Sequence, residues 1–155
     1  MEAEKHTKVT MPNAVLLGEV KQFLREGRRV ILQVKGNSML PFIRGGRDSV
    51  ELTAESSYGI GDIVLAEIDK GHYVLHRIVA IGGHEAADKV VLMGDGNLRD
   101  TEECMRSELV GMVRLILKNG REIDPNTRKE RRKAEIWRRL LPVRRWLLAI
   151  YKRIR

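Results

Sequence analysis

Residues 62–81 read DIVLAEIDKGHYVLHRIVAI, in which two apolar runs lie on either side of a polar turn. The runs, Asp62–Ile68 and Tyr73–Ile81, are rich in Val, Ile and Leu, and the turn between them contains Gly71. Apolar, β-branched runs of this length that are separated by a short turn are typical of paired antiparallel strands. The stretch therefore predicts a β-hairpin near the middle of the chain.

Short apolar runs continue on both sides of this hairpin, separated by glycine-rich or polar turns. The further strand candidates are Val30–Val34, Ser49–Thr53, Lys89–Met93 and Leu109–Leu117. Several short strands at close spacing indicate a compact, mostly antiparallel β domain. We therefore expect a mainly β fold, with the β-rich domain at residues 29–120.

Helical patterns are predicted at both ends of the chain. Residues 13–26 carry apolar side chains at helical spacing, with Asn13 as a candidate N-cap and Gly27 where the helix should end. From Thr127 onward apolar residues recur in steps of three and four, and Pro142 should kink or split this second helix. The expected organisation is an N-terminal tail and helix (1–28), the β-rich domain (29–120) and a basic amphipathic helical tail (121–155).

The composition describes one folded domain with a strongly basic end. The chain has 155 residues, of which 43% are hydrophobic and 32% charged, as is typical of a globular protein rather than a disordered one. The net charge of +8 is uneven, because residues 121–155 hold 13 basic and four acidic side chains, whereas residues 1–120 hold 16 and 17. The single Cys104 excludes an internal disulfide. The polar N-terminus and the lack of an apolar run of about 18 residues predict neither a secretory signal nor a membrane span.

Three segments carry side chains that suit catalysis. Ser38 follows a predicted strand and would become a nucleophile beside a base, although a serine in a turn is more often structural. His76 lies inside a predicted strand, where it is either a general base for a hydroxyl or a hydrogen-bonded residue of the sheet. Asp95 and Asp100 lie in a glycine-rich segment and would either orient such a histidine or serve turn formation. The four histidines and the single cysteine show no recognised metal-ligand spacing, so no metal or cofactor is expected.

Five short segments occur in an order that resembles a known family. They are Gly36–Pro41, Gly61–Val64, His76–Val79, Gly94–Asn97 and Val110–Val113. In this order they resemble the conserved boxes of signal peptidases and LexA-like self-cleaving proteins, over about residues 30–118 of the chain. The histidine–arginine pair that opens the third segment is similar to the archaeal and endoplasmic-reticulum type, whereas the bacterial type has a lysine in place of the histidine.

The resemblance implies a serine endopeptidase that cleaves a peptide or leader segment by a Ser-His-Asp type of mechanism without a cofactor. Its substrate is expected to be an extended peptide that docks beside a strand edge. The residues that it assigns are the nucleophile Ser38, the general base His76, the orienting carboxylates Asp95 and Asp100, and the oxyanion or substrate contacts Asn37 and Met39.

The chain departs from the family pattern in three respects. Gly36 stands where family members commonly have a serine that helps to form the oxyanion hole. The family's usual N-terminal membrane span is not predicted here, and the basic tail lies outside the family core. These departures favour a specialised peptide-processing enzyme over a housekeeping signal peptidase. The alternative is a catalytically inactive peptide-binding or membrane-associated module that retains the fold.

The basic tail allows three interpretations. Its apolar stripe, flanked by arginine and lysine, is typical of a helix lying in a membrane interface. Nucleic-acid binding would explain the charge but not the stripe, and no reader module precedes the tail. The third interpretation is packing on a partner or on the domain itself. The stripe favours peripheral membrane contact through residues 127–155, at the cytoplasmic surface, and removal of these residues is expected to leave cleavage of soluble peptides intact.

Overall fold

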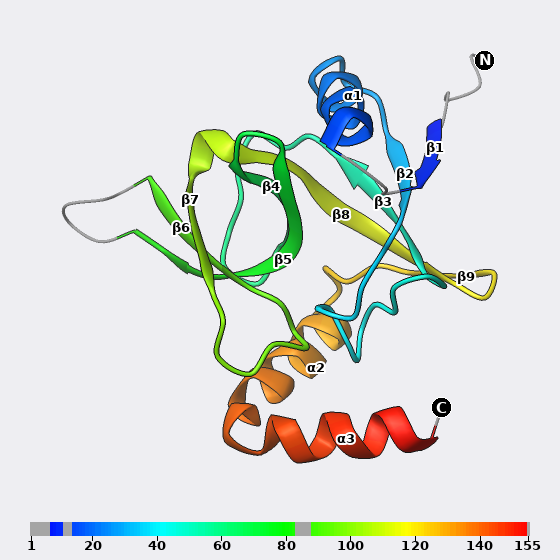
Figure 1. Cartoon of the computed structure of the whole chain (residues 1–155), viewed down its shortest axis with the longest axis vertical. Coiled ribbons are helices and arrows are strands. Elements are labelled where there is room, and N and C mark those ends of the chain that lie inside the picture. The colour runs from blue at the N-terminus through cyan, green and yellow to red at the C-terminus, as the bar shows by residue number, and fades with distance from the viewer. Residues whose placement is uncertain (1–6, 11–13, 83–87, 155) are drawn as a thin grey trace.

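The structure, a computed structural model, describes residues 7–10, 14–82 and 88–154 of the chain. In these ranges it is mainly β, with a short N-terminal helix and two C-terminal helices packed below the sheet (Figure 1), which confirms the expected fold class. Asn13, the candidate N-cap, and two of the histidines, His6 and His84, lie outside the described ranges.

A single coiled sheet forms the body of the molecule. Its strands, in the order in which they pair, are β1 (Thr7–Thr10), β2 (Val30–Gln33), β3 (Ser49–Thr53), β8 (Leu109–Lys118), β4 (Ile63–Asp69), β5 (His72–Ile81), β6 (Lys89–Met93) and β7 (Glu102–Met105), with β9 (Arg121–Ile123) paired to β8. All pairs are antiparallel except β1 with β2. The strands expected from the sequence are all present, and each end lies within one residue of its expected position.

The central hairpin is formed by β4 and β5, as its sequence pattern predicts. Val64 pairs with His76 and Ile63 with Arg77, so these neighbouring residues of β5 face opposite sides of the sheet. β5 also pairs with β6, where Arg77 lies opposite Met93. This register brings the middle of β5 next to the residues that follow β6.

Three strands were not predicted, and one of them moves a domain boundary. β1, β7 and β9 are short and lack long apolar runs. Because β9 pairs with the end of β8, residues 121–123 belong to the sheet and not to the helical tail. The expected division at residue 121 is therefore wrong in detail, and the helical segment begins at Arg128.

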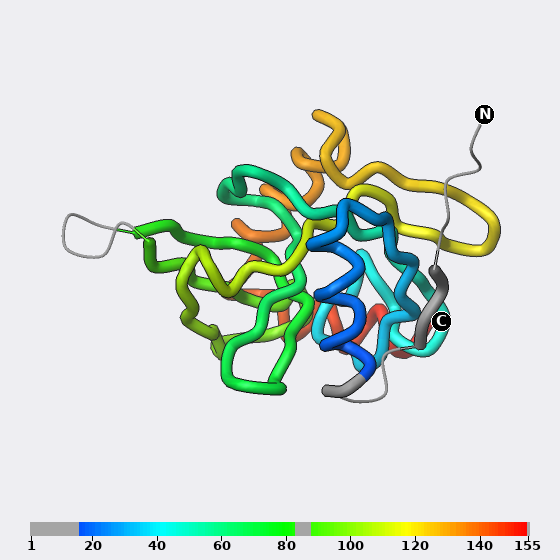
Figure 2. The backbone as a smooth tube through the Cα atoms, turned by 90° about the horizontal axis from the view of Figure 1, so that it is seen from above, coloured from blue at the N-terminus to red at the C-terminus, as the bar shows by residue number. Residues whose placement is uncertain are grey.

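Helix α1 (Ala14–Arg25) lies against the sheet and contacts β2, β5 and β8 (Figure 2). Its apolar face is buried in the core through Leu17, Val20 and Leu24. The buried apolar residues form two core clusters. The larger one contains these three α1 residues and is otherwise built mainly from Val, Leu and Ile of β2, β3, β4 and β8, and the second lies between β4, β5, β6 and β7. Three aromatic residues, Phe23, Phe42 and Tyr73, border the first cluster rather than fill it.

The C-terminal segment consists of α2 (Arg128–Arg139), a short 3-10 turn (Leu141–Val143) and α3 (Arg144–Ile154). Thr127 caps α2 by accepting a hydrogen bond from the Glu130 N–H. Pro142 lies in the turn, which confirms that it splits the predicted helix. In the described part of the chain, none of the helices has the length and apolar character needed to cross a membrane.

Candidate active site

The loop that carries Ser38 is bonded directly to the turn that follows β6. The Gly96 N–H donates to the Ser38 carbonyl oxygen over 2.8 Å, and the Asp95 N–H donates to the sulfur of Met39 over 3.5 Å. A Cβ built on Gly94 would lie 2.3 Å from the Ser38 carbonyl oxygen. Only glycine at position 94 allows the two segments to approach so closely. Gly94 is therefore required for the turn 94–97 to pack against the Ser38 loop.

The same position on Gly94 is also close to His76. The built Cβ would lie 3.1 Å from His76 Nε2, so this nitrogen and the Ser38 carbonyl oxygen converge on one point. The structure thus brings together Ser38 and His76, which are 38 residues apart in sequence. The Ser38 hydroxyl makes no hydrogen bond to a described residue. The hydroxyl is therefore not hydrogen-bonded to His76 in this structure, and such bonds are often long or absent in proteins without bound substrate.

The other ring nitrogen of His76 is held by a residue that the sequence interpretation missed. Glu102, at the start of β7, places its Oε2 2.8 Å from His76 Nδ1. An ionised carboxylate only accepts hydrogen bonds, so a proton lies on Nδ1, and whenever the ring is neutral its lone pair is on Nε2. The His76 side chain is 7% exposed and the Glu102 side chain 22%, so this interaction is largely shielded from water.

Asp95 does not orient His76, contrary to the expected assignment. Both of its carboxylate oxygens accept from Arg77, over 2.9 Å and 2.8 Å, and the pair is buried. Arg77 also donates to the Gly61 carbonyl oxygen and lies over the ring of Phe42. The physical reason is the register of β5: His76 and Arg77 face opposite sides of the sheet, and Asp95 lies on the side of Arg77.

The other expected site residues differ in their positions. Asp100 is exposed and forms no hydrogen bond or ion pair with His76, whose partner is Glu102. Met39 is 1% exposed and belongs to the core, so it is not available to a substrate. Asn37 is exposed beside Ser38, and the backbone N–H of Ser38 donates to no described group. These two donors remain free to bind an oxyanion.

The backbone conformation of residue 36 explains why glycine stands where the resembled family commonly has a serine. Its φ is +82°, a conformation that side-chain-bearing residues rarely adopt, although no other atom would crowd a Cβ there. A serine at this position would have space but would strain the backbone. The loop is therefore built for glycine, and a side-chain donor at this position is incompatible with the loop as it stands.

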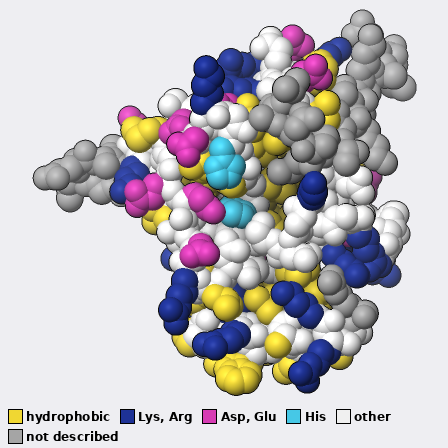
Figure 3. Space-filling view, viewed as in Figure 1, with side chains coloured by type: hydrophobic (Ala, Val, Ile, Leu, Met, Phe, Trp, Pro, Cys, Tyr) yellow, Lys and Arg dark blue, Asp and Glu magenta, His cyan; other side chains and the backbone are white. Residues whose placement is uncertain are grey.

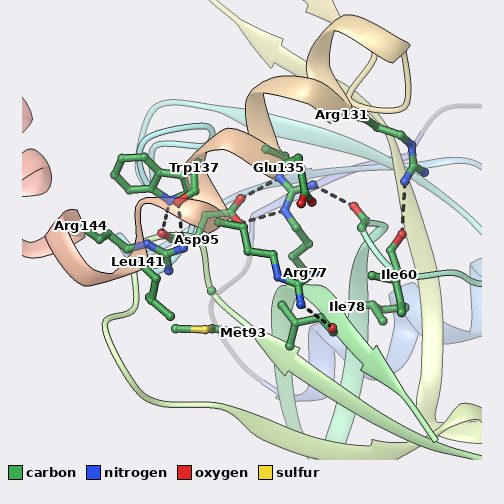
Figure 4. A pocket seen from close by; sticks show the side chains of 15 residues that line it. Ile60, Arg77, Ile78, Met93, Asp95, Arg131, Glu135, Trp137, Leu141 and Arg144 are labelled. Carbon is green, nitrogen blue, oxygen red and sulfur yellow. Dashed lines mark hydrogen bonds and ion pairs between the residues drawn. The ribbon is translucent and has the colours of Figure 1, made fainter.

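The C-terminal helices hold the turn 94–97 from outside. The indole Nε1–H of Trp137 donates to the Asp95 carbonyl oxygen over 2.7 Å (Figure 4), and Arg144 Nη1 donates to the Asn97 carbonyl oxygen over 2.8 Å. Arg144 is 4% exposed and stacks on the Trp137 ring, and its burial lowers the pKa of the guanidinium. We call Trp137 and Arg144 the turn clamp. The sequence interpretation placed both residues in an amphipathic tail, because their partners are backbone carbonyls that no sequence pattern reveals.

A cavity of about 320 Å³ lies between α2 and the sheet, next to the turn clamp (Figure 4). Apolar side chains such as Ile78, Met93 and Leu141 line it, and the Arg77–Asp95 pair lies on its wall. The cavity shares Gly94 with the candidate site, but neither Ser38 nor His76 lines it. It is therefore adjacent to the site rather than part of it.

The face of the molecule that carries histidines differs in charge from the region below it. In Figure 3 histidine side chains reach the surface among acidic ones, while basic and apolar side chains cover the C-terminal helices at the bottom. The described residues contain no cluster of three or more histidine, cysteine, aspartate or glutamate side chains that could hold a metal ion. Cys104 is buried, and this burial raises the pKa of its thiol to about 11, which keeps it protonated and unreactive at neutral pH.

No protein-family model matches the chain, and a search of curated proteins finds no match either. Conclusions about its chemistry therefore depend on the geometry above and on the resemblance of its five short segments.

Proposed function

We propose that the protein is a serine endopeptidase of the signal-peptidase type, with Ser38 as the nucleophile, His76 as the general base and Glu102 as the residue that orients His76. The observation that carries the proposal is the convergence at Gly94. His76 Nε2 and the Ser38 carbonyl oxygen both approach this glycine, while Glu102 holds His76 Nδ1. A nucleophile, a base and an orienting carboxylate are the parts that acyl transfer requires.

The proposed reaction begins when Ser38 Oγ attacks the carbonyl carbon of a peptide bond. The hydroxyl proton passes to His76 Nε2, and the carbonyl oxygen becomes an oxyanion that the free N–H of Ser38 and the Asn37 amide are placed to bind. His76 then donates this proton to the leaving amine nitrogen, and the C–N bond breaks. The products of this stage are a free amine and an acyl-enzyme on Ser38.

Hydrolysis of the acyl-enzyme uses the same groups in reverse. A water molecule gives a proton to His76 Nε2 while its oxygen attacks the ester carbon. When the second tetrahedral intermediate collapses, the proton returns to Ser38 Oγ and the carboxylate product leaves. Throughout both stages Glu102 faces the Nδ1–H of His76 and stabilises the imidazolium that forms twice per cycle.

A second candidate function is non-catalytic peptide binding on the same fold. Two observations favour it: the Ser38 hydroxyl is not hydrogen-bonded to His76 in the described structure, and Gly36 supplies no side-chain donor to an oxyanion hole. Each oxyanion donor is worth about 10²–10³ in rate. The two candidate functions make opposite predictions about turnover.

The test is cleavage of a mixed library of extended peptides, followed by mass spectrometry. The unchanged protein should generate new termini at a reproducible sequence context, and Ser38→Ala should produce none, because it lacks the proposed nucleophile. Ser107→Ala, a change at an exposed serine remote from His76, is the matched control and should cleave like the parent.

Circular dichroism and the melting temperature establish that Ser38→Ala is folded. Equal cleavage by Ser38→Ala and the parent would refute the assigned nucleophile. A folded parent that binds library peptides but cleaves none would establish the binding-module alternative instead.

A further inference from the structure

The outward surface of α3 carries a row of apolar side chains that nothing in the described structure covers. Val143, Trp146, Ile150 and Ile154 are 44%, 68%, 57% and 78% exposed. Their spacing of three, four and four residues places them in one stripe along the helix. A row of exposed, large apolar side chains on one helix face is typical of a surface that binds a protein, a membrane or another apolar ligand.

The opposite side of α3 packs on the body of the protein. Arg144 and Leu148 are buried, at 4% and 6% exposure, and face the body of the protein. The tail is therefore packed on the domain through one face and open on another. Self-packing, one of the three interpretations of the sequence, therefore applies to the buried face, and the exposed face is open to a further partner.

The positive charge of the C-terminal helices indicates that the exposed surface of α3 binds an anionic partner. Residues 136–155 contain seven basic and no acidic side chains. Arg145, Lys152 and Arg153 of α3 are exposed, with Arg153 at the edge of the apolar stripe and Arg145 and Lys152 further around the helix. Near an anionic membrane surface each such charge contributes about 1 kcal/mol, and the adjacent tryptophan is a residue type enriched at membrane interfaces.

We infer that the outward face formed by Val143 of the 3-10 turn and by Trp146, Ile150 and Ile154 of α3, together with the exposed Arg145, Lys152 and Arg153 of the same helix, docks on the surface of an anionic lipid bilayer. The apolar stripe enters the boundary between headgroups and acyl chains, and the basic side chains contact the lipid phosphates. A nucleic acid would leave the apolar stripe in water, so it fits this surface less well. The inference does not depend on the proposed peptidase activity.

Docking in this orientation would keep the candidate site close to the bilayer. Arg144, the first residue of α3, is the residue that bonds Asn97. The helix that rests on the lipid is thereby attached to the turn that carries Gly94. A substrate held at the same membrane surface would reach Ser38 without leaving it.

The experiment measures binding of the full chain to phosphatidylcholine vesicles prepared with and without phosphatidylglycerol. Co-sedimentation should show binding to the anionic vesicles and little to the neutral ones. The double change Trp146→Asp and Ile150→Asp should reduce binding at least tenfold. Arg145→Gln and Arg153→Gln should each reduce it about fivefold, as expected for about 1 kcal/mol per charge.

Matched changes elsewhere on the surface separate the α3 face from general effects. Met105→Asp alters another exposed apolar residue, and Arg121→Gln removes another exposed basic residue. Both variants should bind vesicles like the parent. Tryptophan fluorescence should shift to the blue on binding, and the shift should disappear in Trp146→Phe, because Trp137 is already held against the protein.

Three results would overturn the inference. They are equal binding to neutral and anionic vesicles, no binding to either, or loss of binding in the Met105 and Arg121 controls as large as in the α3 variants. Concentration-dependent self-association or duplex-DNA binding that the α3 changes abolish, without vesicle binding, would assign the face to a second copy or to nucleic acid. Ser38→Ala should bind vesicles normally, so failure of the peptidase proposal is distinguishable from failure of this one.

Discussion

Glu102 is the residue whose replacement best tests the proposed mechanism. Its carboxylate accepts from His76 Nδ1, and this interaction fixes the tautomer that leaves Nε2 unprotonated. In Glu102→Gln the amide nitrogen can donate to Nδ1 instead, which favours the tautomer with its proton on Nε2. We expect kcat to fall by about 10³-fold or more, as when the orienting carboxylate of a serine protease becomes an amide.

The neighbouring Glu103 provides the matched control for this change. It lies on the same strand, is exposed and pairs with Lys89 at the surface. Glu103→Gln should keep full activity, and both variants should unfold at nearly the temperature of the parent. Steady-state cleavage and thermal denaturation measure the two effects. Unchanged kcat in Glu102→Gln would remove Glu102 from the mechanism.

The residues of the candidate site were predictable from the sequence only where they lie in a segment that resembles a family box. Ser38 and His76 were found because their short segments resemble family boxes, and the structure places them next to each other. The acid was assigned to Asp95 because sequence order cannot show which side of the sheet a carboxylate occupies. The alternation of β5 pairs Asp95 with Arg77 and leaves His76 to Glu102.

At the scale of elements, the junction of α2 and α3 is expected to control the geometry of the turn 94–97. Trp137→Phe keeps an aromatic side chain but removes the five-membered ring, and with it the N–H that binds the Asp95 carbonyl oxygen. Loss of this hydrogen bond should cost about 1–3 kcal/mol and lower the melting temperature by about 2–4 °C per kcal/mol. We expect kcat/KM to decrease as well, because the turn that carries Gly94 gains freedom.

Trp146→Phe is the control for the same chemical change. Trp146 is 68% exposed, so its replacement should alter stability by no more than about 0.5 kcal/mol. Thermal denaturation and peptide cleavage should therefore separate the two variants. A Trp137→Phe protein with the parent's stability and activity would show that the clamp does not position the turn.

Long apolar elements were predictable, and short polar ones were not. The six strands with Val-, Ile- and Leu-rich runs were located to within one residue at each end. β7 contains two glutamates and buries only Cys104, because it is an edge strand with one covered face. Its sequence therefore has no apolar alternation to detect. The missed strand is the one that carries Glu102, so the missing element and the missing site residue have one cause.

At the scale of the whole molecule, the basic C-terminal segment and the nearly neutral remainder of the chain occupy different regions of the structure. The body, with nearly equal numbers of acidic and basic residues, holds the candidate site, and the basic segment lies along one end of it (Figures 1 and 3). The sequence predicted this separation correctly in charge. It did not predict that α2 is attached to the body by ion pairs and hydrogen bonds, such as Arg131 to Asp62 and Arg138 to the Val79 carbonyl oxygen.

Truncation after Asn126 decides whether the helical segment is a detachable targeting device, as its composition suggests, or part of the catalytic unit, as its contacts indicate. The truncated chain keeps β9 and every strand of the sheet but loses Trp137 and Arg144, which bind the carbonyl oxygens of Asp95 and Asn97. We therefore expect a lower melting temperature and at least a tenfold loss in kcat/KM on soluble peptides, since each lost buried hydrogen bond costs about 1–3 kcal/mol. The full-length Trp146→Asp and Ile150→Asp variant should keep its activity on soluble peptides, because it changes only the outward face of α3. If the truncated protein cleaves soluble peptides as fast as the parent, the helices serve only in docking, and the bonds of the turn 94–97 to Ser38, Met39 and Arg77 are enough to hold it.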